Sequence, residues 1–505
     1  MVSAQPQTVS APFSIRAILA PLAAIVLGTF MAILDNTVVN VALPTLERIF
    51  NSDLHVMQWV ITAYMLAQAA VIPLAGWLSD RYGARRIYLV SLVLFTIGSV
   101  LCALAPGGEF LVLFRVLQGL GGGMLMPVGM SFLYRLAPPE KRGTVMGMFG
   151  IPILLAPALG PVLSGWLIDR ADWRLIFLIN VPIGIAALLL GLRALPHMAA
   201  QQKASTLDVP GAILGPVAFA ALTYGISESI NAGWTGSSTL LGIGAGTVAL
   251  LAFIAVELRT DNPLLDLRVF RSVDFTLTIV TQWAGQIGLF GALFLIPLFL
   301  QQVHGYGAFD TGLYLLPQAF AAAVAMPVGG RLFDRFGVRV PVITGLFLVV
   351  VSAWLLTGVT SATTGADLRW LLVFRGLGMG LMMMPLNTHL LNAAPKDLVS
   401  RVTALTGALQ NVVGSLGIAG LATVLQSRMA THLAAAQQAG GANVREAAHQ
   451  AMGIAYADTF AASMVPAIIG LILALTLRSR RIKAEAATTM EGNEAAHAAV
   501  SAFAG

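Results

Sequence analysis

An aspartate and an arginine lie inside apolar stretches of this sequence, where ionisable side chains are rare. The segment "GTFMAILDNTVVNVALPTL", residues 28–46, contains Asp35 and, beside it, Asn36. Arg115 lies in a second apolar stretch, six residues after Glu109. A charge at the centre of a membrane-spanning helix costs ~2.5–3.5 kcal/mol on insertion scales, so such residues usually face a polar interior and mark a pathway. A buried carboxylic acid beside a cation can take up and release a proton as its surroundings change.

The composition sets the environment of these two residues. Hydrophobic residues make up 57% of the 505 residues, charged residues make up 10%, and the mean hydropathy is +0.83. Such a chain cannot fold around one aqueous core without exposing apolar surface, which indicates a polytopic membrane protein. The single cysteine, Cys102, lies in an apolar stretch and excludes a disulfide framework or a cysteine-based metal site within this chain.

The elements that must position Asp35 and Arg115 are membrane-spanning helices. Apolar runs of about 20 residues, the length that crosses a ~30 Å hydrocarbon layer as a helix, recur along the chain, and the ten-residue alternation of a membrane barrel does not. We therefore expect an all-α integral membrane protein with fourteen transmembrane helices. They are placed near residues 15–44, 55–79, 86–105, 109–134, 143–167, 174–194, 209–228, 238–258, 273–301, 311–332, 338–359, 367–391, 401–427 and 454–477.

The basic residues predict the orientation of these helices. Of the 29 Lys and Arg residues, 21 fall in loops on one side, 6 fall in loops on the other, and the remaining two, Arg115 and Arg375, lie within spans. The positive-inside rule then places the basic loops and both termini in the cytoplasm. The net charge of +6 would also suit a nucleic-acid partner, but the charges are spread a few to each loop, so no nucleic acid is expected.

The chain contains an internal repeat. "GWLSDRYGARR" at 76–86 closes the second predicted span, and "GRLFDRFGVRV" at 330–340 closes the tenth. "FRVLQGLGGGMLMPVG" at 114–129 and "FRGLGMGLMMMPLNT" at 374–388 form a second pair, at a similar offset. Two six-helix units of the same sense, a parallel repeat, are therefore expected. The predicted divisions are an N-terminal tail (1–14), a first half (15–194), a linker with two extra spans (195–272), a second half (273–478) and a C-terminal tail (479–505).

Five motifs in one order resemble the major facilitator superfamily, specifically its fourteen-span drug:proton antiporter branch of the EmrB/QacA type. "LDNTVVNVALPTL" resembles the first-helix motif of that branch, "GWLSDRYGARR" the loop motif, and "RVLQGLGGGMLMP" the fourth-helix motif. "APALGPVLSGW" at 156–166 resembles the fifth-helix antiporter motif, with Ser164 where glycine is usual, and "WRLIFLINVPIG" at 173–184 the sixth-helix entry. The resemblance implies the major facilitator fold, with two pseudo-symmetric six-helix halves plus two extra central helices.

The resemblance also implies a gating role for the two related loops. Asp80 would make a charge pair or a helix-terminus contact that holds the halves in one state, and the copy around Asp334 favours a shared mechanical role. A plain topology anchor at the lipid headgroups is the other interpretation of the arginines. The gating candidates are Asp80, Arg81, Gly83, Arg85, Asp334 and Arg335.

The fifth span has one face without bulky side chains. Ala156, Gly160 and Ser164 recur every four residues, so a neighbouring helix can approach closely, and Pro161 tends to kink the helix. Ordinary tight packing explains this pattern. The resemblance implies more, a bendable contact between the halves that seals the cavity and prevents uncoupled leak, with Gly160, Pro161, Ser164 and Gly165 as its residues.

Asp35 and Arg115 are the candidates for proton coupling. Counted from the outer ends of their helices, Arg115 lies about 9 Å deep and Asp35 about 13.5 Å deep at 1.5 Å per residue. Both side chains are therefore predicted to face the cavity between the halves at similar height. Direct pairing is a hypothesis, because sequence fixes depth but not the direction around the helix. A permanent structural bridge between them is the competing interpretation.

Other polar side chains and an adaptable apolar surface are predicted to line the same cavity. Buried amides also hydrogen-bond one another at helix contacts, and methionines also serve plain packing, so structural roles compete with the cavity role. The cavity candidates are Asn36, Asn40, Gln58, Thr62, Gln118, Met124, Trp283, Gln410 and Asn411.

The predicted surroundings follow from this topology. The seventh and eighth spans lack central charges and are expected to flank the core. The outward segment 428–453 is polar and alanine-rich, and predicts a helical hairpin or lid that could meet a periplasmic adaptor protein, although a solvated loop also fits. The expected partners are the lipid bilayer, protons and an amphiphilic small molecule. No cofactor or metal is expected, since a proton gradient would supply the energy.

The function indicated is therefore proton-coupled multidrug efflux by alternating access from a bacterial inner membrane, the kind of activity that confers antibiotic resistance. A dedicated exporter of one endogenous metabolite is the alternative, and a proton symporter fits less well because the fifth-helix motif resembles exporters. ATP-driven export has no support in this sequence, because the chain contains no GxxxxGK[ST] loop. No enzymatic triad or metal pattern is present in the sequence, so the chain is not expected to be an enzyme.

Overall fold

The computed structural model describes residues 15–51, 54–170, 172–197, 207–438 and 444–477. Within these ranges the chain is helical and contains no strand, and fourteen helical segments are long and apolar enough to cross a membrane. The predicted fold class and number of spans are therefore confirmed. The division into halves and linker stays a prediction from the repeat.

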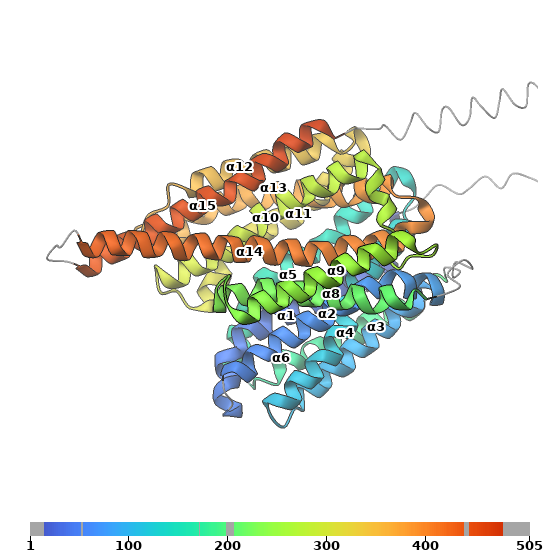
Figure 1. Cartoon of the computed structure of the whole chain (residues 1–505), viewed down its shortest axis with the longest axis horizontal. Helices are drawn as coiled ribbons and strands as arrows, with labels where there is room; N and C mark the ends of the chain where they lie inside the picture. The colour runs from blue at the N-terminus through green and yellow to red at the C-terminus, as the bar shows by residue number, and fades with distance from the viewer. Residues whose placement is uncertain (1–14, 52–53, 171, 198–206, 439–443, 478–505) are drawn as a thin grey trace, which may run out of the picture.

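Most of the helices follow one another with short connections (Figure 1), and the longer connections are 195–208 and 260–272. The first six spans, called the N-terminal half below, are α1 (Ile15–Phe50), α2 (Leu54–Tyr82), α3 (Ala84–Ala103), α4 (Gly108–Leu136), α5 (Arg142–Arg170) and the pair α6 (Leu175–Leu178) and α7 (Asn180–Ala194). The two extra spans are α8 (Val209–Ala232) and α9 (Ser237–Arg259). The C-terminal half comprises α10 (Val273–Gln302), α11 (Ala308–Phe336), α12 (Arg339–Leu356), α13 (Gly365–Ala393), α14 (Val399–Gln438) and α15 (Val444–Thr476). Short 3-10 turns η1 (Pro139–Lys141), η2 (Leu267–Arg271) and η3 (Lys396–Leu398) precede α5, α10 and α14.

Three helices extend well beyond their predicted ends. α1 continues to Phe50, α14 continues to Gln438, and α15 already begins at Val444. The hydropathy of the sequence marks only the apolar part of a helix, whereas alanine and glutamine also favour helix in water. Figure 1 shows the resulting α14–α15 hairpin projecting from one end of the bundle, and His432 Nε2 contacts Asp458 Oδ2 at 2.9 Å across it. The predicted helical hairpin is present, and its position outside the membrane stays a prediction.

The two repeated loops each turn at a glycine with positive φ. Gly83 connects α2 to α3 with φ of 86°, and Gly337 connects α11 to α12 with φ of 78°. Each glycine N–H donates to the carbonyl four residues earlier, Ser79 O at 2.9 Å and Phe333 O at 2.8 Å. A side chain would strain this left-handed backbone, which explains the glycine in both copies. The end of the bundle that carries these loops is called the basic face below, and the other end is called the opposite face.

The two halves meet along α5 and α11. At the basic face a Cβ atom on Gly143 would lie 2.5 Å from the carbonyl oxygen of Gly330, and towards the opposite face a Cβ atom on Gly312 would lie 2.8 Å from Val162 Cγ2. Small residues therefore bring the two backbones together over most of their length.

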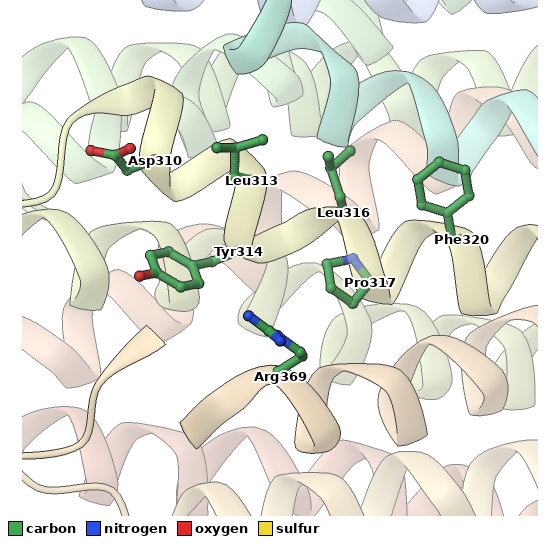
Figure 2. Close-up of a pocket in the computed structure, with 7 residues that line it drawn as sticks. All are labelled: Asp310, Leu313, Tyr314, Leu316, Pro317, Phe320 and Arg369. Carbon is green, nitrogen blue, oxygen red and sulfur yellow. The ribbon is translucent and has the colours of Figure 1, made fainter. Parts of the chain in front are cut away.

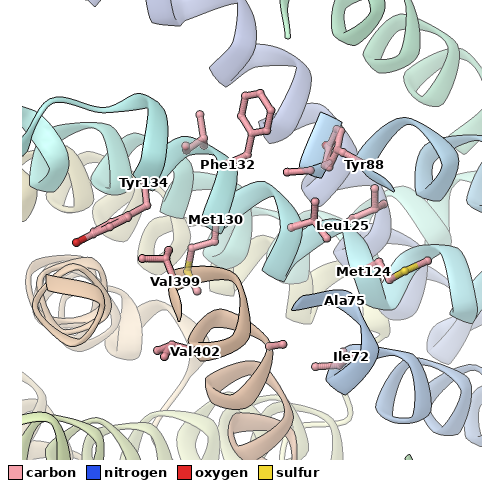
Figure 3. Close-up of a cluster of buried hydrophobic side chains, with 14 of the residues drawn as sticks. Ile72, Ala75, Tyr88, Met124, Leu125, Met130, Phe132, Tyr134, Val399 and Val402 are labelled. Atoms are coloured by element: carbon pink, nitrogen blue, oxygen red, sulfur yellow. The ribbon is translucent and has the colours of Figure 1, made fainter. Parts of the chain in front are cut away.

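A second contact between the halves lies at the basic face between α14 and the α2–α4 pair. A Cβ atom on Gly76 of α2 would lie 2.8 Å from Ser400 O of α14. Figure 3 shows Val399 and Val402 of α14 against Met130 and Tyr134 of α4, inside one buried apolar cluster. The basic face is thus closed by packing in this conformation.

The extra helices lie beside this contact. α8 packs on α9, where a Cβ atom on Gly225 would meet the backbone nitrogen of Ile243 at 2.5 Å. The ring of Tyr224 on α8 stacks on Trp59 of α2 with centroids 6.2 Å apart, and Trp234 Nε1 donates to Thr423 Oγ1 of α14 at 2.7 Å. Trp234 lies in the connection that follows α8, and Ile226 of α8 itself packs with Ala419 of α14 in a small buried cluster. α8 therefore contacts both halves, between α2 and α14.

Replacing Gly330 with valine is expected to weaken closure of the basic face. A Cβ atom there would lie 2.6 Å from the carbonyl carbon of Gly143 and 3.0 Å from Thr144 Cα, and neither backbone atom can move unless α5 and α11 separate. Overpacking of this kind costs ~1–3 kcal/mol, so the equilibrium constant for closure should fall by roughly 5- to 150-fold. Pulsed EPR between spin labels at positions 86 and 335, both exposed at this face, would detect the wider distances.

Gly244→Val is the matched control. Gly244 lies on exposed α9, and a Cβ atom there meets nothing within 4 Å. Identical distance distributions for Gly330→Val and Gly244→Val would contradict the assignment of the α5–α11 contact as the closure.

Candidate functional site

The centre of the N-terminal half contains a buried ion pair between α1 and α4. Arg115 Nη1 donates to Asp35 Oδ2, and both side chains are 0% exposed. The other carboxylate oxygen, Oδ1, accepts from Gln118 Nε2 at 2.9 Å and from Asn180 Nδ2 at 2.7 Å. The structure thus joins the two residues whose pairing the sequence left as a hypothesis. Asp35 is held by one cation and two amides.

The arginine is held from three further directions. Its Nε donates to Val60 O of α2 at 3.1 Å, and Nη1 also donates to Gln118 Oε1 at 2.7 Å. The guanidinium lies 3.8 Å from the ring centroid of Tyr64, whose hydroxyl donates to Ala32 O of α1. A cation over an aromatic face gains more when both are desolvated, as they are here. The network therefore fixes Arg115 against α1 and α2 together.

Two members of this network escaped the sequence analysis. Ser99 Oγ on α3 accepts from Gln118 Nε2 at 2.6 Å and from Asn180 Nδ2 at 3.1 Å. Asn180 begins α7, inside the stretch read only as a sixth-helix entry. Gly98 lets α3 reach α4 here, since a Cβ atom on it would lie 2.8 Å from Gln118 Cα. A serine or asparagine in an apolar span is common enough that its type alone gave no signal.

The position of Asp35 and Arg115 corrects the expectation that both side chains face the cavity between the halves. Asp35, Arg115 and Gln118 are fully buried, and their hydrogen-bond partners all come from α1–α4 and α7. In this conformation they lie inside the N-terminal half, and Gln118 belongs to the network instead of lining a cavity between the halves. Met124 is buried too. The similar depth of Asp35 and Arg115 follows from the sequence. The direction in which their side chains point depends on Asn180 and Ser99, which are distant from them in the sequence.

The other predicted cavity residues lie on α1, α2, α10 and α14. Asn40, Gln58 and Asn411 are exposed, and the partly exposed members are Asn36, Thr62, Trp283 and Gln410. An amide that is exposed at membrane depth is unfavourable where it faces lipid and favourable where it faces water. These positions therefore remain the candidates for lining a polar path. Gln286 Nε2 of α10 donates to Gln410 O at 3.2 Å, which brings α10 next to α14.

Asp334 makes the first predicted gating contact between the halves. Its Oδ1 accepts from Gly143 N at 2.8 Å, and its Oδ2 accepts from Thr144 N at 2.9 Å and Thr144 Oγ1 at 2.6 Å. These donors form the first turn of α5, where the helix dipole favours a negative charge. The carboxylate of the C-terminal half thus caps a helix of the N-terminal half.

Asp80 makes the pseudo-symmetric contact. Arg135 Nη2 of α4 donates to Asp80 Oδ1 at 3.2 Å and to Ser400 Oγ at 2.6 Å, and Arg401 Nε lies 3.7 Å from Asp80 Oδ2. Ser400 and Arg401 begin α14, the counterpart of α5 in the second half. A third bridge, which the sequence analysis missed, runs from Tyr134 to Asn392 of α13, O to O at 2.7 Å.

The remaining gating candidates lie elsewhere on the basic face. Arg85 donates to Leu192 O of α7 at 2.6 Å, so in this conformation it ties helices of one half together and is no bridge between halves. Arg81 and Arg335 are exposed, and Gly83 forms the turn described above.

The fifth helix uses two faces, and this corrects a second expectation. The small face packs on α1, since a Cβ atom on Gly160 would lie 2.6 Å from Thr37 Cβ and Ser164 Oγ donates to Val38 O at 2.9 Å. Pro161 and Gly165 lie on the side that contacts α11 at Gly312 and Phe309. The contact between the halves is therefore made beside the small-residue stripe and not by it. Spacing alone identifies a stripe but not its neighbour.

Arg375 has no carboxylate partner among the described residues. It occupies the position of Arg115 in the repeated motif and is 0% exposed. Its Nη2 donates to Gly288 O at 2.6 Å, while Nε and Nη1 have no hydrogen-bond partner in the described part of the chain. The two halves are thus electrostatically unequal, since one contains a neutralised pair and the other a lone buried cation.

Fold and site together define a multi-pass helical membrane protein with buried charge networks and two carboxylates that bridge its halves. Within the described residues no group of three or more His, Cys, Asp or Glu side chains could hold a metal ion. This architecture is that of a membrane transporter.

Comparisons with known proteins identify the family. A model of the Major Facilitator Superfamily matches residues 25–418. The multidrug resistance protein B homolog of Mycobacterium tuberculosis is 38% identical over 406 residues, which cover 79% of this chain and 75% of that protein. The multidrug export protein EmrB of Haemophilus influenzae is 32% identical over 411 residues, 81% of each chain. The chain belongs to the Major Facilitator Superfamily, and its relatives are transporters and not enzymes.

A solved structure agrees with this fold. The major facilitator proton:xylose symporter XylE, bound to 6-bromo-6-deoxy-D-glucose, matches with a TM-score of 0.59 and 14% identity over 90% of this chain and 95% of that one. At this identity the likeness shows the fold alone.

Removing either buried arginine should have unequal effects on stability. Arg115→Met leaves Asp35 buried without its cation, and breaking such a pair costs ~3–5 kcal/mol. Arg375→Met leaves no described carboxylate without its cation. It removes hydrogen bonds only to backbone carbonyls, which should lower the free energy of unfolding by ~1–3 kcal/mol. The apparent melting temperature in detergent should fall much further for Arg115→Met, and Asp35→Asn in the same chain should restore part of the loss. Equal losses would contradict the assignment.

Proposed function

We propose that this chain exports amphiphilic small molecules from the cytoplasm or inner leaflet of a bacterial inner membrane, in exchange for protons. The observation that carries the proposal is Asp35, a fully buried carboxylate held by Arg115, Gln118 and Asn180. Relatives named as multidrug resistance and multidrug export proteins support the substrate class. The cycle would need no cofactor, because the proton gradient supplies the energy.

Protonation of Asp35 would rearrange this network. A neutral carboxylic acid is a weaker partner for Arg115 than the carboxylate, since a charge-assisted hydrogen bond is roughly twice as strong as a neutral one. The guanidinium and the two amides would then seek other partners, and they belong to helices α4 and α7. Proton binding and release would therefore change how α1 packs on its neighbours.

The fifth helix connects this change to the contact between the halves. α5 packs on α1 through Gly160 and Ser164, the latter bonded to Val38 O three residues beyond Asp35. Its other side packs on α11. A shift of α1 would thus be passed to α5 and from there to the C-terminal half.

The basic face is proposed to be cytoplasmic, following the positive-inside rule, with both termini on that side. Asp80 and Asp334 would then close the cytoplasmic gate in this conformation, and opening it would require both carboxylates to leave their partners. The α14–α15 hairpin would extend outside, where it could meet a periplasmic adaptor protein.

The charges of the site narrow the substrate. A single deep carboxylate that is already paired with an arginine suits neutral, weakly acidic or monocationic amphiphiles better than dications, because a second positive charge would lack a partner. The lone cation Arg375 disfavours dications further. A dedicated exporter of one metabolite with these properties is the alternative.

Asp35→Asn should abolish coupled transport. Asparagine keeps the shape of the side chain and some of its hydrogen bonds but cannot take up a proton. Dye accumulation driven by an imposed pH gradient in inside-out vesicles should drop to the level of protein-free vesicles. Asp172→Asn, an exposed acid on the opposite face, is the control and should transport normally. Gradient-driven accumulation that Asp35→Asn leaves intact would refute the proton site, while absent dye transport in the native protein would favour the narrow exporter.

Asp334→Asn should open the proposed cytoplasmic gate. An amide cannot accept from two backbone N–H groups and the Thr144 hydroxyl through two oxygens, and its charge at the α5 terminus is gone. The loss of ~1–3 kcal/mol would shift molecules towards wider EPR distances between positions 86 and 335. Asp80→Asn should shift the same distances, whereas the exposed Asp261→Asn on the same face should not. Unchanged distances in both gate variants would remove the gating role.

A further inference from the structure

A groove on the outside of the N-terminal half lies at the basic face between α3 and α7. Its volume is about 650 Å³. Leu89 and Val93 of α3 and Leu188 and Leu192 of α7 line its length, and Val93 and Leu192 are exposed. A groove with apolar walls on the outer surface of a membrane protein fits an acyl chain.

The end of the groove nearest the basic face is lined by basic side chains. Arg85, Arg86 and His197 contribute to its lining, and no acidic side chain does. Arg85 is held in place, because its Nη1 lies 2.9 Å from His197 Nδ1 and its Nη2 donates to Leu192 O. Its buried Nε has no hydrogen-bond partner among the described residues.

Arg86 completes this rim. It is exposed, and no ion pair or hydrogen bond joins it to another described residue. The rim therefore offers one anchored and one available guanidinium on the same helix end. Guanidinium groups bind phosphate in a fixed, bidentate geometry.

A second recess at the opposite face provides a comparison. It measures about 490 Å³ and lies between α11 and α13 (Figure 2). There Arg369 reaches towards Tyr314 and Pro317, but Asp310 lines the same recess. One acid and one base leave this recess without net charge, whereas the α3–α7 groove has only positive charge. The two recesses should differ in the lipids they attract.

We propose that the α3–α7 groove is a specific site for an anionic phospholipid. One acyl chain would lie along Leu89, Val93 and Leu188, and the phosphate would bind at Arg85 and Arg86. A free phosphate ion would gain nothing from the apolar walls, and a zwitterionic lipid would bring a cation to a basic rim. The combination of an apolar channel and an acid-free basic end therefore selects a lipid with net negative charge. The inference rests on the membrane location and does not depend on proton coupling.

Native mass spectrometry of the purified full-length protein tests this site. The detergent-solubilised, delipidated protein would be titrated with phosphatidylglycerol and, separately, with phosphatidylcholine. Phosphatidylglycerol should bind at lower concentration than phosphatidylcholine. Arg86→Gln should weaken phosphatidylglycerol binding about fivefold, the effect of one basic residue near a lipid surface. Arg86→Lys keeps the charge but lacks the bidentate fork, so it should restore only part of the binding.

Matched variants distinguish the binding of the lipid headgroup from the binding of its acyl chain. Arg259→Gln removes an exposed arginine from the last turn of α9 at the same face and should leave binding unchanged. Val93→Trp should fill the channel and weaken both lipids, whereas Leu251→Trp on the exposed side of α9 should not. Melting in lipid-free detergent would verify that each variant is folded.

Three results would overturn the proposal. They are equal affinities for the two lipids, equal effects of Arg86→Gln and Arg259→Gln, and full displacement of phosphatidylglycerol by inorganic phosphate, which would make the rim a free-anion site.

Discussion

The ion pair between Asp35 and Arg115 is the interaction on which the N-terminal half is organised. Burying either charge without a partner at membrane depth is costly, and the structure lowers this cost by bringing α1 and α4 together and adding hydrogen bonds to both side chains. Asn180, Ser99 and Val60 supply them from three more helices. Arg115 Nη2 and Asn180 Oδ1 have no hydrogen-bond partner among the described residues, so the network is not fully satisfied. It would be sensitive to protonation of a single oxygen, because several partners are shared between its members.

The two halves share a backbone plan but differ in their charges. At the basic face the repeat is preserved, since Asp80 and Asp334 each reach the start of the counterpart helix in the other half. At the core it is broken, because Arg375 repeats Arg115 without an aspartate. The repeat is thus kept where the halves touch at the basic face and lost in the core, so the proposed proton coupling would act through the N-terminal half.

The sequence predicted the elements and their depth better than their contacts. Fourteen spans, the repeated loops and the equal depth of Asp35 and Arg115 follow from hydropathy, motif offset and helix rise. The direction of a side chain around its helix does not, which is why Gln118 was expected in a cavity and the Gly160 stripe was expected between the halves. Asn180 and Ser99 could be found only through their neighbours, since an isolated polar residue in a span has no period. The roles of all these residues in transport stay predictions.

The extra helices are tied to the same closure, although they lie outside the repeat. Arg401, which approaches Asp80 from α14, also donates through Nη1 to Pro263 O at 2.8 Å, in the connection that follows α9. Glu257 of α9 holds that connection by accepting from Leu264 N and Leu265 N, each at 3.2 Å. Any opening that withdraws Arg401 from Asp80 must therefore either break the Pro263 contact or carry α9 and its partner α8 along. Because α8 also contacts α2 and α14 near the opposite face, the added pair restrains both ends of one contact between the halves.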